Sequence, residues 1–201
     1  RGLILQGQVD IVRALLKLNS SSGTMTFQLA EKELQSMPMF NAHGGLSLQK
    51  FRSQWQFWST SLQSKIDSGL FSTEPELEMI MKLITGDNQA WMSVCQESMT
   101  WYEYFAGYLF YTQPSVRYFE LGTFADNWLS NWALERGSGL KPLDRMVLAV
   151  LKNDMTEFVH SIQDFGDNKW FVVHIVDLLV HCDQLRISDE ANVQSVLALR
   201  E

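Results

Sequence analysis

Apolar residues recur in steps of three and four along most of the chain, which is the spacing of one face of an α-helix. The clearest case is Ser47–Asp67, after which Gly69 is placed as a stop signal. Its apolar stripe consists of Leu48, Phe51, Trp55, Trp58, Leu62 and Lys65-Ile66. The sequence shows no convincing pair of hairpin strands and no alternation of strand and helix patterns. An all-α fold is therefore predicted.

Further segments carry the same spacing. They are the residues after Thr73-Glu74-Pro75-Glu76, then Ser98–Tyr111, Tyr118–Arg136, Pro142–Lys152, Met155–Ile162 and Trp170–Cys182. Thr73 is predicted to open its helix with a capping box, and Pro75 suits the first turn. Trp170–Cys182 is apolar almost all round, which predicts a central helix covered on both sides; a buried strand over its Val-rich start is the alternative. The chain is expected to have about ten helices joined by short loops.

Three short strings share a pattern that predicts tight turns between antiparallel helices. They are Leu5-Gln6-Gly7-Gln8, Ile84-Thr85-Gly86-Asp87 and Leu151-Lys152-Asn153-Asp154. Each has an apolar helix end, a Gly or Asn suited to left-handed backbone, and a polar residue before a new apolar face. Such turns favour an irregular α-helical solenoid of stacked antiparallel helix pairs, and a compact helical bundle remains the alternative.

On this interpretation, residues 1–201 form a single α-solenoid fragment that is part of a longer helical domain. Flexible breaks are expected near 19–23, 38–46 and 137–139. The chain begins at Arg1 without Met, which also suggests a piece of a longer protein. We therefore expect Leu3-Ile4-Leu5 and Val196-Leu197-Leu199 to pack on helices outside this chain.

Composition excludes several classes of protein. Only 19% of the residues are charged and 46% are apolar, which excludes intrinsic disorder. Sixteen Lys and Arg stand against 23 Asp and Glu, so the clustered positive charge of a direct nucleic-acid binder is missing. No apolar run is long enough for a transmembrane segment. Cys95 and Cys182 are interpreted as two reduced, buried thiols.

The best candidate for chemistry is a group of polar residues near the end of the chain. His174, Asp177 and His181 share one helical face, with Cys182 beside them, and these residue types can bind zinc. The group lacks a second pair of ligands and a catalytic base, so polar residues on a buried helix, hydrogen-bonded to neighbouring helices, are the favoured interpretation. No catalytic, cofactor-binding or metal-binding residue is predicted, and the chain is not expected to be an enzyme.

Two pairs of tryptophans admit two interpretations. Trp55 with Trp58, and Trp128 with Trp132, have the residue type of partner-binding anchors. They also lie on the apolar stripes of predicted helices, and side chains of a helical core are the favoured interpretation.

Several strings together resemble a known family. They are Leu5-Gln6-Gly7, Met37-Pro38, Gly45-Leu46-Ser47-Leu48, Trp55 with Trp58, Gly86-Asp87, Trp101-Tyr102, Pro114 with Val116 and, most specifically, Trp170–Cys182. In order and spacing they resemble the metazoan eighty-five-kilodalton scaffold nucleoporins, which belong to the Y-shaped nuclear pore subcomplex and the ancestral coatomer element family.

The resemblance implies a bent stack of helices without a catalytic site or cofactor. It implies a structural scaffold component of the nuclear pore complex at the nuclear envelope, supporting nucleocytoplasmic transport that includes mRNA export and protein import. The implied partners are other Y-complex nucleoporins and a small β-propeller subunit, the latter through a region N-terminal to this fragment. The alternative is an α-solenoid subunit or adaptor of a vesicle coat.

Overall fold

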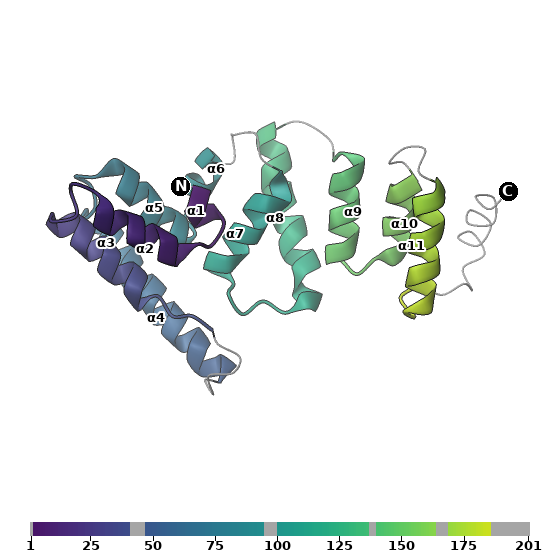
Figure 1. Ribbon diagram of the computed structural model, residues 1–201, viewed down its shortest axis with the longest axis horizontal. Coiled ribbons are helices and arrows are strands. Elements are labelled where there is room, and N and C mark those ends of the chain that lie inside the picture. Colours follow the sequence, from purple (N-terminus) through teal and green to yellow (C-terminus); the bar gives the residue numbers. More distant parts are fainter. Residues whose placement is uncertain (1, 41–46, 95–99, 137–139, 164–168, 186–201) are drawn as a thin grey trace. The chain divides into compact units, whose positions relative to one another are not determined.

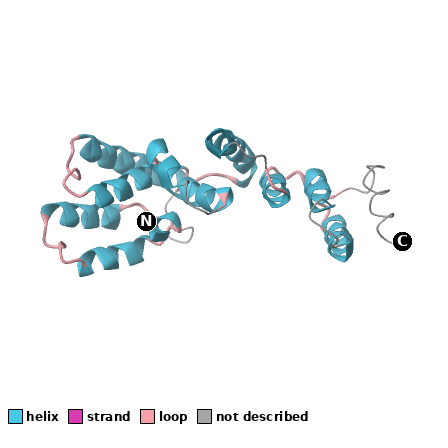
Figure 2. Ribbon diagram, turned by 90° about the horizontal axis from the view of Figure 1, so that it is seen from above, coloured by secondary structure: helices cyan, strands magenta, loops and turns pink. Residues whose placement is uncertain are grey.

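The computed structural model describes residues 2–40, 47–94, 100–136, 140–163 and 169–185. These residues form eleven α-helices and one 3-10 helix, and Figure 2 shows helices and loops but no strand among them. The helices are α1 (Gly2–Leu5), α2 (Val9–Leu18), α3 (Met25–Ser36), α4 (Leu48–Asp67), α5 (Pro75–Thr85), α6 (Asn88–Val94), α7 (Trp101–Thr112), η1 (Tyr118–Glu120), α8 (Leu121–Arg136), α9 (Pro142–Leu151), α10 (Met155–Gln163) and α11 (Lys169–His181). The all-α prediction is confirmed.

The chain divides into two compact units, an N-terminal unit over Arg1–Val116 and a C-terminal unit over Arg117–Glu201. The prediction of a single solenoid fragment over residues 1–201 is not tested by this division and stays a prediction. Of the predicted breaks, 19–23 forms a hydrogen-bonded turn between α2 and α3. Residues 41–46 of the second break, and all of 137–139, lie outside the described residues.

Helix α1, the first helix of the chain, lies among later helices of the N-terminal unit (Figure 1). This helix packs against α2, α5 and α7, while α3 packs against α2 and α5, and α5 also contacts α4 and α6. Ile4 is fully buried, and its carbonyl accepts a hydrogen bond from Tyr111 Oη at 2.8 Å. The prediction that Leu3-Ile4-Leu5 packs outside this chain is therefore wrong for Ile4, because α5 and α7 of the same chain cover it. Val196-Leu197-Leu199 lies outside the described residues.

The main contacts of the C-terminal unit join helices that follow one another, α8 with α9, α9 with α10 and α10 with α11. Its buried cluster consists of Val159, Ile162, Val172, Val176 and Leu185. Each helix is thus supported mainly by its neighbours in the chain, which is the pattern of a helical stack.

The three predicted tight turns are confirmed. Gly7, Gly86 and Asn153 have φ angles of 70°, 81° and 56°, in the left-handed region. A new helix begins two residues after each of them. Asp87 and Asp154 cap the new helices, since their Oδ1 atoms accept the backbone N–H three residues on at 2.8 and 3.0 Å. These side chains satisfy N–H groups that have no partner inside the helix.

The capping box predicted at Thr73 is wrong. Helix α5 begins at Pro75, so Glu74 is the N-cap residue and makes no side-chain capping bond. With the N-cap at Glu74, the N3 position falls on Leu77, which has no oxygen to complete the box. A capping box does occur at α7, where Glu103 accepts from the backbone N–H and the hydroxyl of Thr100 at 2.9 and 2.6 Å.

The prediction that Trp170–Cys182 is a central, doubly covered helix is also wrong, as is its strand alternative. Lys169–His181 is the α-helix α11, and Val172 and Val176 are buried in the cluster described above. Trp170 is 73% exposed and Leu178 is 57% exposed. Among the described residues α10 is the helix that packs on α11, so one face is covered and the opposite one is open to solvent.

Candidate interaction surfaces

The predicted polar group on α11 lies on the surface. His174, Asp177, His181 and Cys182 are all exposed, so the expectation that they lie on a buried helix is wrong. The His174 ring lies against the Trp170 ring, with centroids 4.3 Å apart and planes at 66°. No group of three His, Cys, Asp or Glu side chains within the described ranges is placed to hold a metal ion. Cys182 is a free, exposed thiol rather than a buried one, and Cys95 lies outside the described residues.

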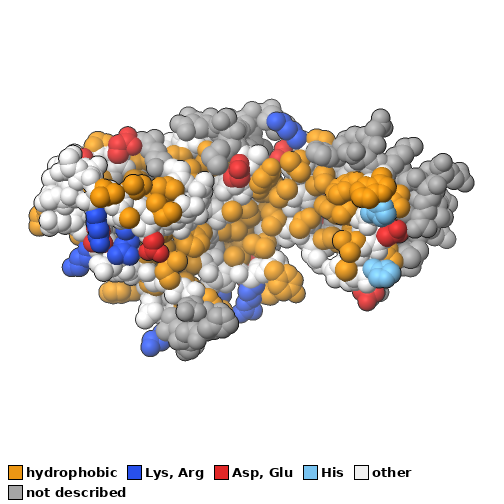
Figure 3. Space-filling model, in the orientation of Figure 1, with side chains coloured by type: hydrophobic (Ala, Val, Ile, Leu, Met, Phe, Trp, Pro, Cys, Tyr) orange, Lys and Arg blue, Asp and Glu red, His pale blue; other side chains and the backbone are white. Residues whose placement is uncertain are grey.

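The open side of α11 forms the first candidate surface, which we call the α11 face. It consists of Trp170, Phe171, His174, Asp177, Leu178 and His181. Figure 3 shows hydrophobic side chains and histidines together over this part of the molecule. Trp is one of the residue types enriched at the hot spots of protein interfaces, and exposed apolar patches often mark such interfaces.

The tryptophan pairs are core side chains where the structure describes them. Trp55, Trp58 and Trp128 are buried, and Trp58 Nε1 donates to the carbonyl of Glu33 at 3.1 Å. The core interpretation is thus confirmed for these three residues. The side chain of Trp132 lies outside the described ones.

A second candidate surface, the α2 face, lies on the side of α2 opposite to its buried residues. Val9 and Val12 point into the core, whereas Ile11, Leu15 and Leu18 form an exposed stripe at helical spacing. Leu18 is 82% exposed. Contiguous exposed apolar side chains of this kind often mark a contact surface for another protein.

Ion pairs fix the helices that carry the α2 face. Glu31 on α3 accepts from Arg13 at 3.2 Å and from Lys17 at 3.4 Å, both on α2. The hydrogen bond from Arg13 is the main cause that holds the pKa of Glu31 below its ordinary value. The α2 and α3 helices are therefore tied by charge along one edge as well as by their apolar contact.

A more deeply buried pair joins α3 to α4. Glu33 is almost fully buried, and its Oε1 atom lies 2.7 Å from Lys65 Nζ. The carboxylate at this depth requires a partner, because an unpaired charge in the interior is costly.

The predictions made from the sequence do not include the exposure of the α2 and α11 faces. The apolar positions on α2 occur at two different angles around the helix, with 9 and 12 on one side and 11, 15 and 18 on the other. Two stripes on one helix indicate a second contact surface, and this signal was present in the sequence. On α11 the signal is the set of polar residues on one helical face, His174, Asp177 and His181, which the structure places on the open side.

None of the helices among the described residues is both long enough and apolar enough to span a membrane.

The whole chain matches a known protein family. The model of the Nup85 nucleoporin family covers residues 1–201. Nuclear pore complex protein Nup75 of Drosophila melanogaster is 40% identical over 201 residues, 100% of this chain and 30% of that protein. Nup85 of Xenopus tropicalis is 30% identical over 184 residues, which are 90% of this chain and 28% of the relative. Human Nup85 is 27% identical over 187 residues, 92% of this chain and 28% of that protein.

These relatives are named nuclear pore complex proteins, and the matches do not favour the vesicle-coat alternative. The chain spans about 30% of the length of the first of these relatives. The match over all of its residues, together with the all-α fold, leads to one conclusion: the chain belongs to the Nup85 nucleoporin family.

Proposed function

We propose that this chain is a helical segment of a structural scaffold component of the nuclear pore complex at the nuclear envelope. In that role it supports nucleocytoplasmic transport, including mRNA export and protein import. The observation that carries the proposal is the match of the Nup85 nucleoporin family to residues 1–201, from the first residue to the last.

The proposed mechanism is mechanical. Short turns at Gly7, Gly86 and Asn153, whose N–H groups donate to carbonyls of the preceding helix, fix where one helix ends and the next begins. Left-handed residues with hydrogen-bonded caps leave little freedom at these joints. Helices held in this way keep the α2 face fixed within the N-terminal unit and the α11 face fixed within the C-terminal unit, each available to a neighbouring subunit.

The partners follow from the same proposal. We propose that the full-length protein assembles with other nucleoporins of the Y-shaped subcomplex. A small β-propeller subunit would bind it through a region N-terminal to this segment. The apolar character of the α2 and α11 faces suits protein partners, and the net charge of −7 does not favour direct contact with nucleic acid.

No enzymatic role is proposed. The exposed His174, Asp177 and His181 are assigned to the surface of α11, and the named relatives are nuclear pore complex proteins.

The proposal is tested by imaging the full-length protein, tagged at its own gene, in cells. We expect a continuous signal at the nuclear rim and co-purification with nucleoporins. As a matched control, the same tag on a protein lacking residues 1–201 reports whether this segment is needed for assembly. A signal confined to cytoplasmic vesicles, with coat subunits as the co-purifying proteins, would contradict the proposal.

A further inference from the structure

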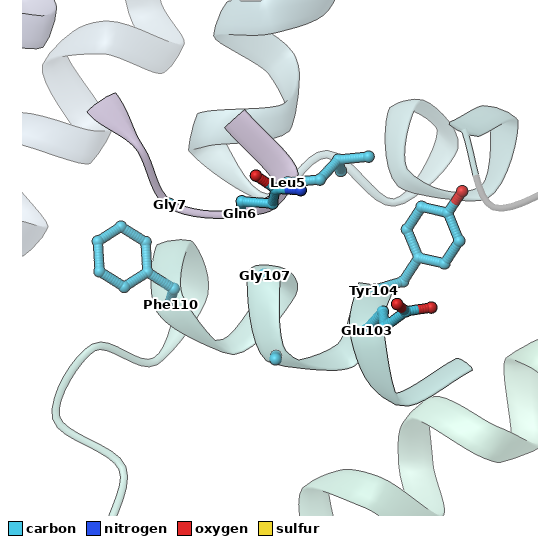
Figure 4. Close-up of a pocket in the computed structure, with 8 residues that line it drawn as sticks. Leu5, Gln6, Gly7, Glu103, Tyr104, Gly107 and Phe110 are labelled. Carbon is cyan, nitrogen blue, oxygen red and sulfur yellow. The ribbon is translucent and has the colours of Figure 1, made fainter. Parts of the chain in front are cut away.

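A groove of about 440 Å³ lies where the turn that joins α1 to α2 crosses α7, beside the crossing point. Figure 4 shows the turn lying across α7 at Gly107, with Phe110 at one end and Glu103 and Tyr104 at the other. The lining consists of Leu5, Gln6, Gly7, Glu103, Tyr104, Ala106, Gly107 and Phe110, all from the N-terminal unit. Its volume lies within the usual range of about 300–1,000 Å³ for ligand pockets.

The groove is a consequence of small residues at the crossing point. A side chain at Gly107 would bring its Cβ to 2.5 Å from the carbonyl oxygen of Leu5, so only glycine permits this crossing. Gly7 turns the chain with a φ of 70°, and Phe110 lies within van der Waals reach of it. Ala106 adds only a methyl group to the exposed side of α7. The turn can therefore approach the helix closely while the space beside it stays empty.

The lining of the groove is mainly apolar and carries one charged side chain. The Tyr104 hydroxyl is engaged inside the protein, where it donates to the carbonyl of Val94 at 2.9 Å. Glu103 is the single charged residue of the lining, and its Oε2 atom caps α7 through Thr100. The hydrogen bonds from Thr100 also lower the pKa of Glu103, so the carboxylate is charged at neutral pH. An apolar trough with one negative end complements an apolar group next to a positive one.

We propose that this groove binds a short segment of a partner protein in which an apolar side chain stands beside a Lys or Arg. The apolar side chain lies against Ala106, beside the crossing at Gly107, and the cation lies near Glu103. A protein segment suits a trough that is open along a helix better than an anion does, because the lining offers no positive charge. The proposal rests on the scaffold function proposed above, since it names a kind of partner that such a scaffold would hold.

The test uses the full-length protein and two small probes, N-acetyl-leucyl-arginine amide and N-acetyl-leucyl-glutamate amide. Saturation-transfer NMR measures the binding of each probe. We expect the arginine probe to bind about twofold to fivefold more tightly than the glutamate probe, as for one exposed ion pair. Ala106→Trp fills the groove from an exposed position and should abolish the binding of both probes. Glu103→Gln keeps a capping oxygen and should remove the preference for the arginine probe.

Gln56→Trp is the matched control, because it adds the same bulk at an exposed position on α4. It should leave both probes bound as before, and circular dichroism shows whether each variant is folded. Equal binding of the two probes, unchanged binding by Ala106→Trp, or no binding by the unaltered protein would each overturn the groove proposal. If the probes do not bind as expected, only the groove proposal is overturned, and the nuclear-rim signal is still expected. If the tagged protein gives no nuclear-rim signal, the scaffold function is overturned whatever the probes do.

Discussion

In the N-terminal unit, α1 packs against α7, and the hydrogen bond from Tyr111 to Ile4 joins residues that are 107 positions apart in the sequence. In the C-terminal unit, the main contacts join each helix to the next one in the chain. The same kind of left-handed turn occurs in both units, at Gly86 in the first and Asn153 in the second. The two units therefore differ in how their helices are tied together rather than in their local structure.

This difference has consequences for stability and for function. Where an early helix is packed among later ones, the helices of a unit must open together. In a stack held by neighbours, stability is roughly a sum of local terms, so its helices can open separately. The N-terminal unit thus offers a rigid groove, and the C-terminal unit offers an open helix face at α11.

The largest expected effect comes from Trp91→Ala, which tests whether the N-terminal unit opens as one. Trp91 is fully buried, and its Nε1 donates to the carbonyl of Leu83 at 2.9 Å. Removing a large buried aromatic side chain should cost about 3–5 kcal/mol. Denaturant unfolding measures the loss, and hydrogen exchange should show it across α1, α5 and α7. If only α6 loses protection, the unit is not cooperative.

The next effect compares an ion pair from each unit. Lys65→Met leaves the buried Glu33 carboxylate without its partner and should cost about 2–3 kcal/mol, below the usual value because Lys65 is partly exposed. Lys152→Met removes the exposed pair with Asp126, 2.7 Å apart, and should cost less than about 1 kcal/mol. Urea unfolding of the two variants measures both values. Equal losses in the free energy of unfolding would show that the ion pairs of the two units do not differ in strength.

A smaller effect is expected from Tyr111→Phe, which removes the hydrogen bond to Ile4 while the Ile4 carbonyl keeps the one from the Gly7 N–H, at 2.9 Å. The expected cost is about 0.5–1.5 kcal/mol, with exchange in α1 accelerated most. Thermal unfolding measures the stability, and an unchanged α1 would show that this bond does not hold the helix in place.

The same variant has a pH signature. Burial raises the pKa of Tyr111 above its ordinary value. Because the pKa in the folded state exceeds that of the unfolded chain, near about 10, this contribution to stability is complete below that pH and falls as the pH rises through the folded pKa. The loss of stability between pH 9 and 11 should be smaller in Tyr111→Phe than in the unaltered protein, as measured by denaturant unfolding at each pH.

The last comparison is between equivalent turns in the two units. Gly86→Ala should cost at least about 1–2 kcal/mol, from the left-handed backbone alone. Its new Cβ would also press on the Thr112 side chain of α7. Asn153→Gly should be neutral within about 1 kcal/mol, because glycine adopts the same φ without strain. Thermal unfolding measures the stability of the two variants. An unchanged stability in Gly86→Ala would contradict the close packing of α7 on this turn.

Much of this fold follows from sequence pattern. Helix α4 has its buried stripe where the three- and four-residue spacing predicts it, and the turns at Gly7, Gly86 and Asn153 were identified from a residue able to take a positive φ. Both features are local, since each depends on residues within one or two helical turns. The division into two units was not predicted, because it depends on which helices meet.

The surfaces were harder to predict for a physical reason. Trp170 and Leu178 on α11 are as apolar as the buried Val172 and Val176, so only the polar residues of α11 mark its open side. The groove depends on the crossing at Gly107, which joins segments about a hundred residues apart. The residue spacing around Gly107 does not predict that the Leu5 carbonyl lies against it.

Hydrogen exchange of the full-length protein under native conditions tests the contrast between the units most directly. We predict that the slowest amides of α1, α5 and α7 share one opening free energy, whereas the slowest amides of α8, α9, α10 and α11 differ from helix to helix. A single opening free energy across both units, or protection in α1 that is lost before that in α7, would contradict the account.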